Sequence, residues 1–252
     1  MSKSFDVIGN IAILQIKGRK RENMKKFAKV LLKKQKNIKS VFLRSKIQSR
    51  LRVPKLKWLA GSKETETIHK ESGCSFKLNI STCYFSPRLG TDRIEIAKKV
   101  KKGERVLIMF SGIAPYPIII SKYSGAKEIY AVEIGKEASK YAQENVKLNK
   151  LKNIRIIQGD VKRIVPRLKR KFDRIVMARP QLKEDFLKEA FIAAKKGTII
   201  HFYDFVPSLE ESIKKINRAA GKSKKVVEII GLKKVREIAP YRYHIRIDFK
   251  IL

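Results

Sequence analysis

The first eighty residues alternate short apolar runs with basic stretches, a pattern that predicts a small α+β module. The expected elements are two strands in residues 5–16 about a Gly-Asn turn, an amphipathic helix over 19–36 with a basic outer face, a strand over 40–43, and a hairpin over 65–80.

The pattern changes near residue 90, where fully apolar strands begin to alternate with helices. The expected strands are 105–110, 128–133, 154–158, 174–177 and 198–203, with helices over 91–100, 136–148 and 183–194 and another directly after the first of these strands. Strands that are apolar along their whole length indicate a parallel sheet covered on both faces. Two further strands, over 226–233 and 243–249, would close this α/β sheet with an antiparallel hairpin.

The chain therefore divides into two expected domains, a basic α+β module over residues 1–82 and an α/β domain over residues 83–252. No Pro/Ser-rich linker separates them, so we expect them to pack closely. The segment 84–93, Tyr-Phe-Ser-Pro-Arg-Leu-Gly-Thr-Asp-Arg, stands at the entrance to the second domain and could hold a substrate base against a reacting group.

Charge narrows the range of partners. The net charge is +37, and residues 1–60 carry 18 Lys and Arg against only Asp6 and Glu22. Such a field attracts polyanions, so we expect a nucleic-acid partner; a general lysine bias of the proteome is the alternative reading.

The two cysteines, Cys74 and Cys83, lack metal-ligand spacing, which favours free thiols in a reducing cytoplasm and no metal. We also expect no membrane span, because the longest apolar run, 106–120, is short and interrupted.

Three strand ends carry the residues of a nucleotide site. Gly112 follows the first strand, Glu133 ends the second 21 residues later, and Asp160 follows the third. Parallel sheets bind ligands at these ends, and carboxylates there suit ribose hydroxyls and an adenine amino group. The chain contains neither G-x-G-x-x-G nor G-x-x-x-x-G-K-[ST], which leaves S-adenosylmethionine as the favoured cofactor. Alternatively, both acids are ordinary strand-end caps.

Several motifs carry a resemblance across nearly the whole chain. They are Phe-Asp-Val-Ile-Gly-Asn at 5–10, Leu-Arg-Val at 51–53, Leu-Ala-Gly at 59–61, His-Lys-Glu-Ser-Gly at 69–73, Tyr-Phe-Ser-Pro-Arg-Leu at 84–89, Met-Phe-Ser-Gly-Ile-Ala-Pro-Tyr at 109–116, Glu-Asn-Val-Lys-Leu-Asn at 144–149 and His-Phe-Tyr at 201–203. The chain resembles the archaeal and eukaryotic tRNA guanine-37 N1-methyltransferases. The resemblance implies a Rossmann-like class I methyltransferase sheet and methyl transfer to the base 3′ of the anticodon, with tRNA bound by its anticodon loop region.

The resemblance also implies roles for individual residues. Guanine N1 carries a proton, so a base must take it while a cation stabilises charge on O6. The implied O6 cation is Arg52 and the implied base is Asp92, with Tyr84 holding the target base. The implied cofactor contacts are Arg93, Phe110, Gly112, Glu133, Ile134, Asp160 and Val161, and the implied substrate contacts are Arg88, Arg179 and Pro180. Arg52 as a phosphate contact, and Asp92 as a residue favourable to the dipole of the next helix, remain open alternatives.

The chain departs from the family pattern at a few positions. Asp92 stands where the family usually has Glu, Ile108 where it has Asp, and Ala114 where it has Gly. Ala-Arg-Pro at 178–180 replaces an Asn-Leu-Pro type motif, and the family's small N-terminal tRNA-elbow module has no counterpart here.

Two other functions remain open. One is aminocarboxypropyl transfer, with the same cofactor, to the wyosine base at the same tRNA position; the other is a tRNA-binding homologue with weakened catalysis. In each case we expect a cytoplasmic protein and a monomer.

Overall fold

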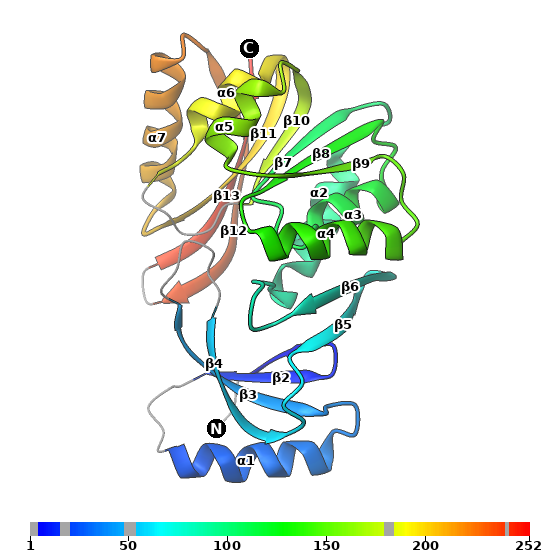
Figure 1. The fold of residues 1–252 in the computed structure, drawn as a ribbon. Helices are drawn as coiled ribbons and strands as arrows, with labels where there is room; N and C mark the ends of the chain where they lie inside the picture. The colour runs from blue at the N-terminus through cyan, green and yellow to red at the C-terminus, as the bar shows by residue number, and fades with distance from the viewer. Residues whose placement is uncertain (1–4, 16–20, 48–53, 179–183, 240–241) are drawn as a thin grey trace.

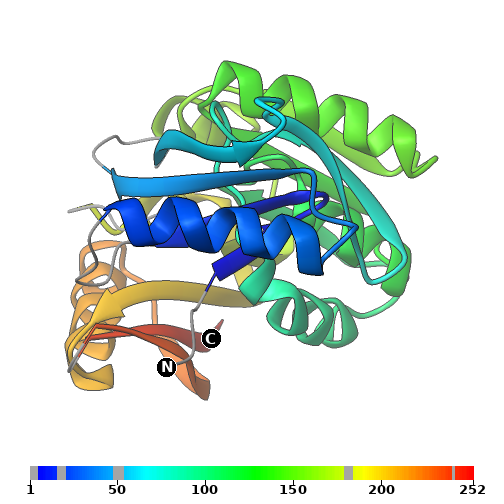
Figure 2. The ribbon, with the colours of Figure 1, turned by 90° about the horizontal axis from the view of Figure 1, so that it is seen from below.

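The computed structural model describes residues 5–15, 21–47, 54–178, 184–239 and 242–252 (Figure 1). Its N-terminal part is a four-stranded sheet in the order β1-β2-β3-β4. Its elements are β1 (Phe5–Ile8), β2 (Ile11–Gln15), α1 (Arg21–Lys34), β3 (Ser40–Ile47) and β4 (Pro54–Gly61). Figure 2 shows α1 lying along this sheet.

Helix α1 is amphipathic, as the pattern predicts. Met24, Ala28 and Leu31 are buried against the sheet, together with Ala12, Val41 and other residues of β2, β3 and β4. The lysines of the opposite face are exposed, namely Lys25, Lys26, Lys29, Lys33 and Lys34. The expected basic outer face is therefore confirmed.

A two-stranded hairpin, β5 (Glu66–Glu71) and β6 (Cys74–Asn79), follows the first sheet. The β1–β2 turn docks on it: Gly9 donates its N–H to His69 Nδ1 at 3.2 Å, and Asn10 donates to Thr67 Oγ1 at 3.2 Å. Gly9 has a φ of 55°, and a Cβ there would lie 2.1 Å from Thr67 Oγ1, so the close approach requires glycine.

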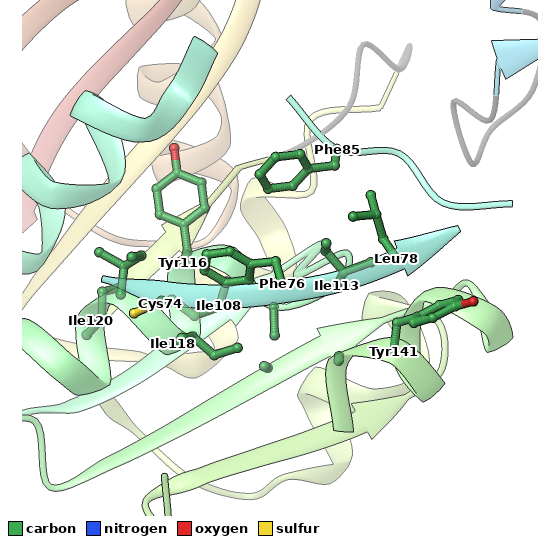
Figure 3. Packing of buried hydrophobic residues seen from close by; sticks show 14 of the residues in the cluster. Cys74, Phe76, Leu78, Phe85, Ile108, Ile113, Tyr116, Ile118, Ile120 and Tyr141 are labelled. Carbon is green, nitrogen blue, oxygen red and sulfur yellow. The ribbon is translucent and has the colours of Figure 1, made fainter. Parts of the chain in front are cut away.

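The inner face of β6 belongs to the core of the second domain. Cys74, Phe76 and Leu78 point toward Ile113, Ile118 and their neighbours under the large sheet (Figure 3). The same cluster includes Ile8 and Phe42 of the first sheet, so the two parts pack closely, as expected. The boundary that we expect after residue 82 leaves this hairpin in the first module, although its packing is shared with the second.

The second domain is a seven-stranded sheet in the order β12-β13-β11-β10-β7-β8-β9. Its strands are β7 (Arg105–Met109), β8 (Glu128–Glu133), β9 (Ile154–Gln158), β10 (Phe172–Met177), β11 (Ala194–Val206), β12 (Val227–Ala239) and β13 (Arg242–Ile251). Strands β7 to β11 pair in parallel, whereas β13 pairs antiparallel with both β11 and β12. The expected α/β sheet with an antiparallel C-terminal hairpin is confirmed.

Helices cover both faces of this sheet (Figure 1). A 3₁₀ turn (Pro87–Leu89), α2 (Gly90–Lys99), α3 (Pro115–Tyr123) and α4 (Lys136–Leu148) lie on one face, and α5 (Val161–Arg167), α6 (Leu187–Ala193) and α7 (Leu209–Lys222) on the other. The pattern missed α5, α7 and β4, and it made α6 too long. Within the described residues, no helix has the length and apolarity needed to cross a bilayer.

Candidate active site

The loop after β7 has an unusual backbone. Phe110, Gly112 and Ala114 all have positive φ values, of 66°, 57° and 68°. Gly112 adopts a positive φ at no steric cost. Ala114 stands where the family usually has Gly, and for an alanine the same left-handed backbone conformation costs about 1–2 kcal/mol. The nearest atom to a Cβ on Gly112 would be Tyr84 O at 3.9 Å, so the space beside this loop is open.

Glu133, the last residue of β8, links this loop to the next. Its Oε2 accepts the N–H of Gly112 at 2.8 Å, and its Oε1 accepts the N–H of Gly135 at 2.7 Å. Burial raises the pKa of this carboxyl, while the two N–H donors act in the opposite direction. Each carboxylate oxygen still has a lone pair to offer, which is what a pair of ribose hydroxyls requires.

Asp160 caps a helix and also lies at the edge of the cavity. It is the N-cap of α5, where its Oδ1 accepts the N–H of Lys162 at 3.0 Å. It also lines the cavity beside Val161. Capping and ligand binding are therefore compatible here, because the cap holds the carboxylate at the edge of the site.

These loops surround one cavity of about 310 Å³ at the carboxyl ends of the parallel strands. The expected site residues that line it are Tyr84, Phe110, Gly112, Glu133, Ile134, Asp160 and Val161. A glycine turn, two carboxylates and apolar side chains are a lining that fits an adenosyl group.

Three expected residues, Arg52, Arg179 and Pro180, lie outside the described residues. Arg88 does not line the cavity; its Nε donates to Asp6 Oδ1 at 2.6 Å and joins the 3₁₀ turn to β1. This contact brings the two parts of the chain together beside the site.

Arg93 is placed differently from the expectation of a cofactor contact. It is 1% exposed, and its guanidinium forms a double hydrogen bond with the Glu71 carboxylate and donates to Ser86 O at 3.1 Å. It also lies over the Phe85 ring, 5.1 Å from the centroid. A paired guanidinium behind the cavity wall holds the hairpin against α2, so Arg93 supports the site without lining it.

Asp92 also lies behind the wall rather than in the cavity. It is 3% exposed in the first turn of α2, and its Oδ1 accepts from Arg246 at 2.6 Å. Its Oδ2 accepts the hydroxyls of Tyr116, at 2.8 Å, and Tyr203. Both tyrosines line the cavity, so they stand between a bound base and this carboxylate. Direct contact of Asp92 with the target base, which the family resemblance implied, is therefore not what this structure shows.

The tyrosine pair is held in its protonated form. Burial and the Asp92 carboxylate raise the pKa of Tyr116, and burial together with its neighbours Tyr116 and Asp92 raises that of Tyr203, in each case well above 10. Each hydroxyl therefore remains a donor to Asp92 at neutral pH.

A chain of buried polar groups continues from Arg246 beneath the sheet. Arg246 Nε donates to Asp248 Oδ1 at 2.9 Å, and His201 Nδ1 lies 2.7 Å from the same oxygen. Arg174 lies 2.8 Å from His201 Nε2; because a guanidinium can only donate, His201 must accept there and carry its proton on Nδ1. Burial lowers the pKa of His201, consistent with this neutral form.

The cavity has a second side that the sequence patterns did not predict. Its residues come from β11 and the β12–β13 hairpin: Tyr203, Phe205, Arg236 and His244. The rings of Phe205 and His244 stack with centroids 4.4 Å apart and planes 5° from parallel. Alternation along β11, which places residues 203 and 205 on one face, was the available signal. Ala178 also lines this side, without the amide that Asn would supply.

The order of strands, the glycine turn and the two strand-end carboxylates define a class I methyltransferase, and its cofactor is S-adenosylmethionine. The chain belongs to the TRM5/TYW2 family: the TRM5/TYW2 methyltransferase domain matches residues 67–230, and the TYW2 N-terminal domain matches residues 1–65.

Individual relatives agree with this assignment. The chain is 38% identical to the Pyrococcus abyssi tRNA (guanine(37)-N(1))-methyltransferase Trm5b, over 98% of this chain and 74% of that protein. It is 31% identical to the tRNA(Phe) (4-demethylwyosine(37)-C(7)) aminocarboxypropyltransferase of Methanocaldococcus jannaschii, over 99% and 98% of the two chains.

Solved structures show the same fold with relevant ligands. A complex of aTrm5 with tRNALeu superposes with a TM-score of 0.89 at 35% identity, covering 100% of this chain and 72% of that one. The M. jannaschii TYW2 structure in complex with AdoMet superposes with a TM-score of 0.75 at 27% identity, covering 99% and 100%.

Proposed function

We propose that this enzyme transfers a methyl group from S-adenosylmethionine to N1 of guanosine 37 in tRNA. The observation that carries the proposal is the single cavity, in which an adenosyl side built by Gly112, Glu133 and Asp160 adjoins an aromatic side built by Tyr84 and Tyr203. Similarity to Trm5b across nearly the whole chain supports the same reaction.

The cofactor supplies an electrophilic methyl group, and the protein supplies position and a route for the proton. Tyr84 and the Phe205–His244 stack offer flat apolar surfaces for a purine ring. In the transfer, the bond between the methyl carbon and the sulfonium sulfur would break as N1 forms its bond to that carbon, and the cofactor would leave as S-adenosylhomocysteine. The N1 proton would leave through the Tyr203 hydroxyl, which donates to Asp92 Oδ2 and so makes that carboxylate the final proton acceptor. Asp92 thus acts through the tyrosine, because the ring separates it from the cavity.

The RNA partner is held by charge. The exposed lysines of α1 and a net charge of +37 favour binding to phosphates of the tRNA, with the anticodon loop at the cavity. The same charge disfavours self-association, so we propose a monomer. The free thiols Cys74 and Cys83 suit the reducing cytoplasm.

The test uses tRNA transcripts that carry guanosine or adenosine at position 37, tritiated methyl donor, and mass spectrometry of the digested nucleosides. We expect N1-methylguanosine from the first transcript alone. Absence of label at low salt with excess enzyme would refute the proposed reaction.

Aminocarboxypropyl transfer is the second candidate. Two observations favour it: the N-terminal match is to the TYW2 domain, and the chain covers 100% of the M. jannaschii TYW2 structure. Ala178, in place of the usual Asn, also distinguishes the cavity from the methyltransferase pattern. The same mass spectrometry decides, because the transferred groups differ greatly in mass.

A further inference from the structure

Arg236 reaches the cavity because β12 is bulged. In the hairpin, Lys233 pairs with Arg246 and Arg236 pairs with His244, with a register shift between Lys234 and Arg236. Simple alternation from Lys233 would turn Arg236 to the opposite face of the sheet. The extra residue, Val235, reverses this, so Arg236 shares the cavity face with His244.

The guanidinium of Arg236 is poised to bind an acceptor. Its Nε is buried and has no hydrogen-bond partner among the described residues. A buried donor of this kind costs about 1–3 kcal/mol unless an acceptor is present. An unpaired donor in the wall of a ligand cavity therefore points to a ligand atom.

The charges around the cavity are separated. The acids that line it, Glu133, Glu137 and Asp160, all belong to the adenosyl side. The lysine and arginine among its described lining residues are Lys136, at the start of α4 beside those acids, and Arg236 on the aromatic side. Negative charge that develops on the substrate would thus meet Arg236 rather than a carboxylate.

We propose that Arg236 donates to O6 of the target guanine and stabilises the charge that gathers there as N1 loses its proton. The inference rests on the proposed function, since it assigns a substrate contact in the same cavity. Arg236 becomes a catalytic residue and also sets specificity: guanine and hypoxanthine present an acceptor at position 6, whereas adenine presents an amino group that a guanidinium repels.

The experiment compares Arg236→Ala and Arg236→Lys with Arg218→Ala, a control that removes an exposed arginine on α7. Single-turnover rates are measured with tRNA carrying guanosine, inosine or adenosine at position 37. Removal of one charge-stabilising donor typically lowers the rate by about 10²–10³-fold. We expect this loss for Arg236→Ala, a partial loss for Arg236→Lys, and wild-type rates for Arg218→Ala, with cofactor affinity unchanged and no fall in melting temperature in all three.

The pH dependence gives a second readout. Without a cation at O6, the guanine N1 proton is harder to remove, so the rate profile of Arg236→Ala should shift to higher pH. An unchanged profile together with an unchanged rate would overturn the assignment. The assignment would also be overturned if Arg236→Ala bound tRNA more weakly but kept a normal rate at saturating tRNA, with the slope of log affinity against log salt smaller by about one. That combination of results is typical of a phosphate contact. The Arg52→Ala variant is measured in parallel. If Arg52→Ala lowers the rate and Arg236→Ala does not, the assignment of Arg236 is likewise overturned.

A binding measurement separates this inference from the proposed reaction. With S-adenosylhomocysteine present, wild-type protein should bind guanosine-37 tRNA more tightly than adenosine-37 tRNA, and Arg236→Ala should lose that preference. This readout needs no methyl transfer, so it remains decisive if nucleoside analysis finds a different modification. Equal preference in wild type and variant would exclude Arg236 as the base contact.

Discussion

Asn145 of α4 joins the β5–β6 hairpin to the cofactor loop. Its side chain is fully buried; Oδ1 accepts the N–H of Lys77 at 2.7 Å, and Nδ2 donates to Lys77 O at 3.0 Å and Ile113 O at 3.1 Å. The asparagine therefore mimics a neighbouring strand along β6, and also fixes the carbonyl of the residue after Gly112.

The substitution Asn145→Ala removes all three hydrogen bonds. At about 1 kcal/mol net for each bond, we expect the free energy of unfolding to fall by about 3 kcal/mol. Unsatisfied buried groups, such as the Ile113 carbonyl, would raise this cost further. Cofactor affinity should fall as well, because the loop beside Gly112 loses its anchor.

Asn149, one turn later, provides a matched control. It makes the equivalent pair of bonds to Ser75, at 2.9 and 2.7 Å, and its Nδ2 also donates to Asn145 O at 2.8 Å, but it is only partly buried, so water can replace these bonds. We expect Asn149→Ala to cost about 1 kcal/mol and to leave cofactor affinity unchanged. Urea unfolding and titration calorimetry provide both measurements. Equal costs for the two variants would refute the reasoning from burial and hydrogen bonding.

Three further predictions concern the site and its support. Glu133→Gln should weaken cofactor binding by about 10–100-fold in calorimetry, the loss expected for a charged hydrogen bond, while Glu144→Gln, at a partly exposed position of α4 outside the cavity lining, should not change it. Arg246→Met should lower the free energy of unfolding in urea by about 3–5 kcal/mol, since it leaves Asp92 buried without its guanidinium partner; a cost below about 1 kcal/mol would contradict the ion pair. Burial lowers the pKa of His201 below 6.5, so the stability that it contributes is present above about pH 6.5 and lost as pH falls through the folded value. The slope of unfolding free energy against pH, measured between about pH 7.5 and 5.5, should therefore flatten in His201→Gln.

The expected parallel sheet and its closing hairpin followed from patterns that are local in the chain. An apolar strand such as 105–109 must be covered on both faces, and its carboxyl end then lies beside those of its parallel neighbours. For this reason the strand-end positions of Gly112, Glu133 and Asp160 predicted one site, and all three line the cavity. Amphipathic α1 was equally visible, because its buried face repeats with the helical period.

Other features were decided only by contacts between distant segments. Arg93 and Asp92 lie in a motif next to the cavity, yet partners far along the chain, Glu71 and Arg246, hold both side chains behind its wall. The approach of Arg236 depends on a bulge, which alternation in the sequence does not reveal. The sequence alone determines which residue types occur and with what period. The direction in which a buried charged side chain points depends on which oppositely charged side chain the packing brings close to it, because an unpaired ion in the core is too costly to remain.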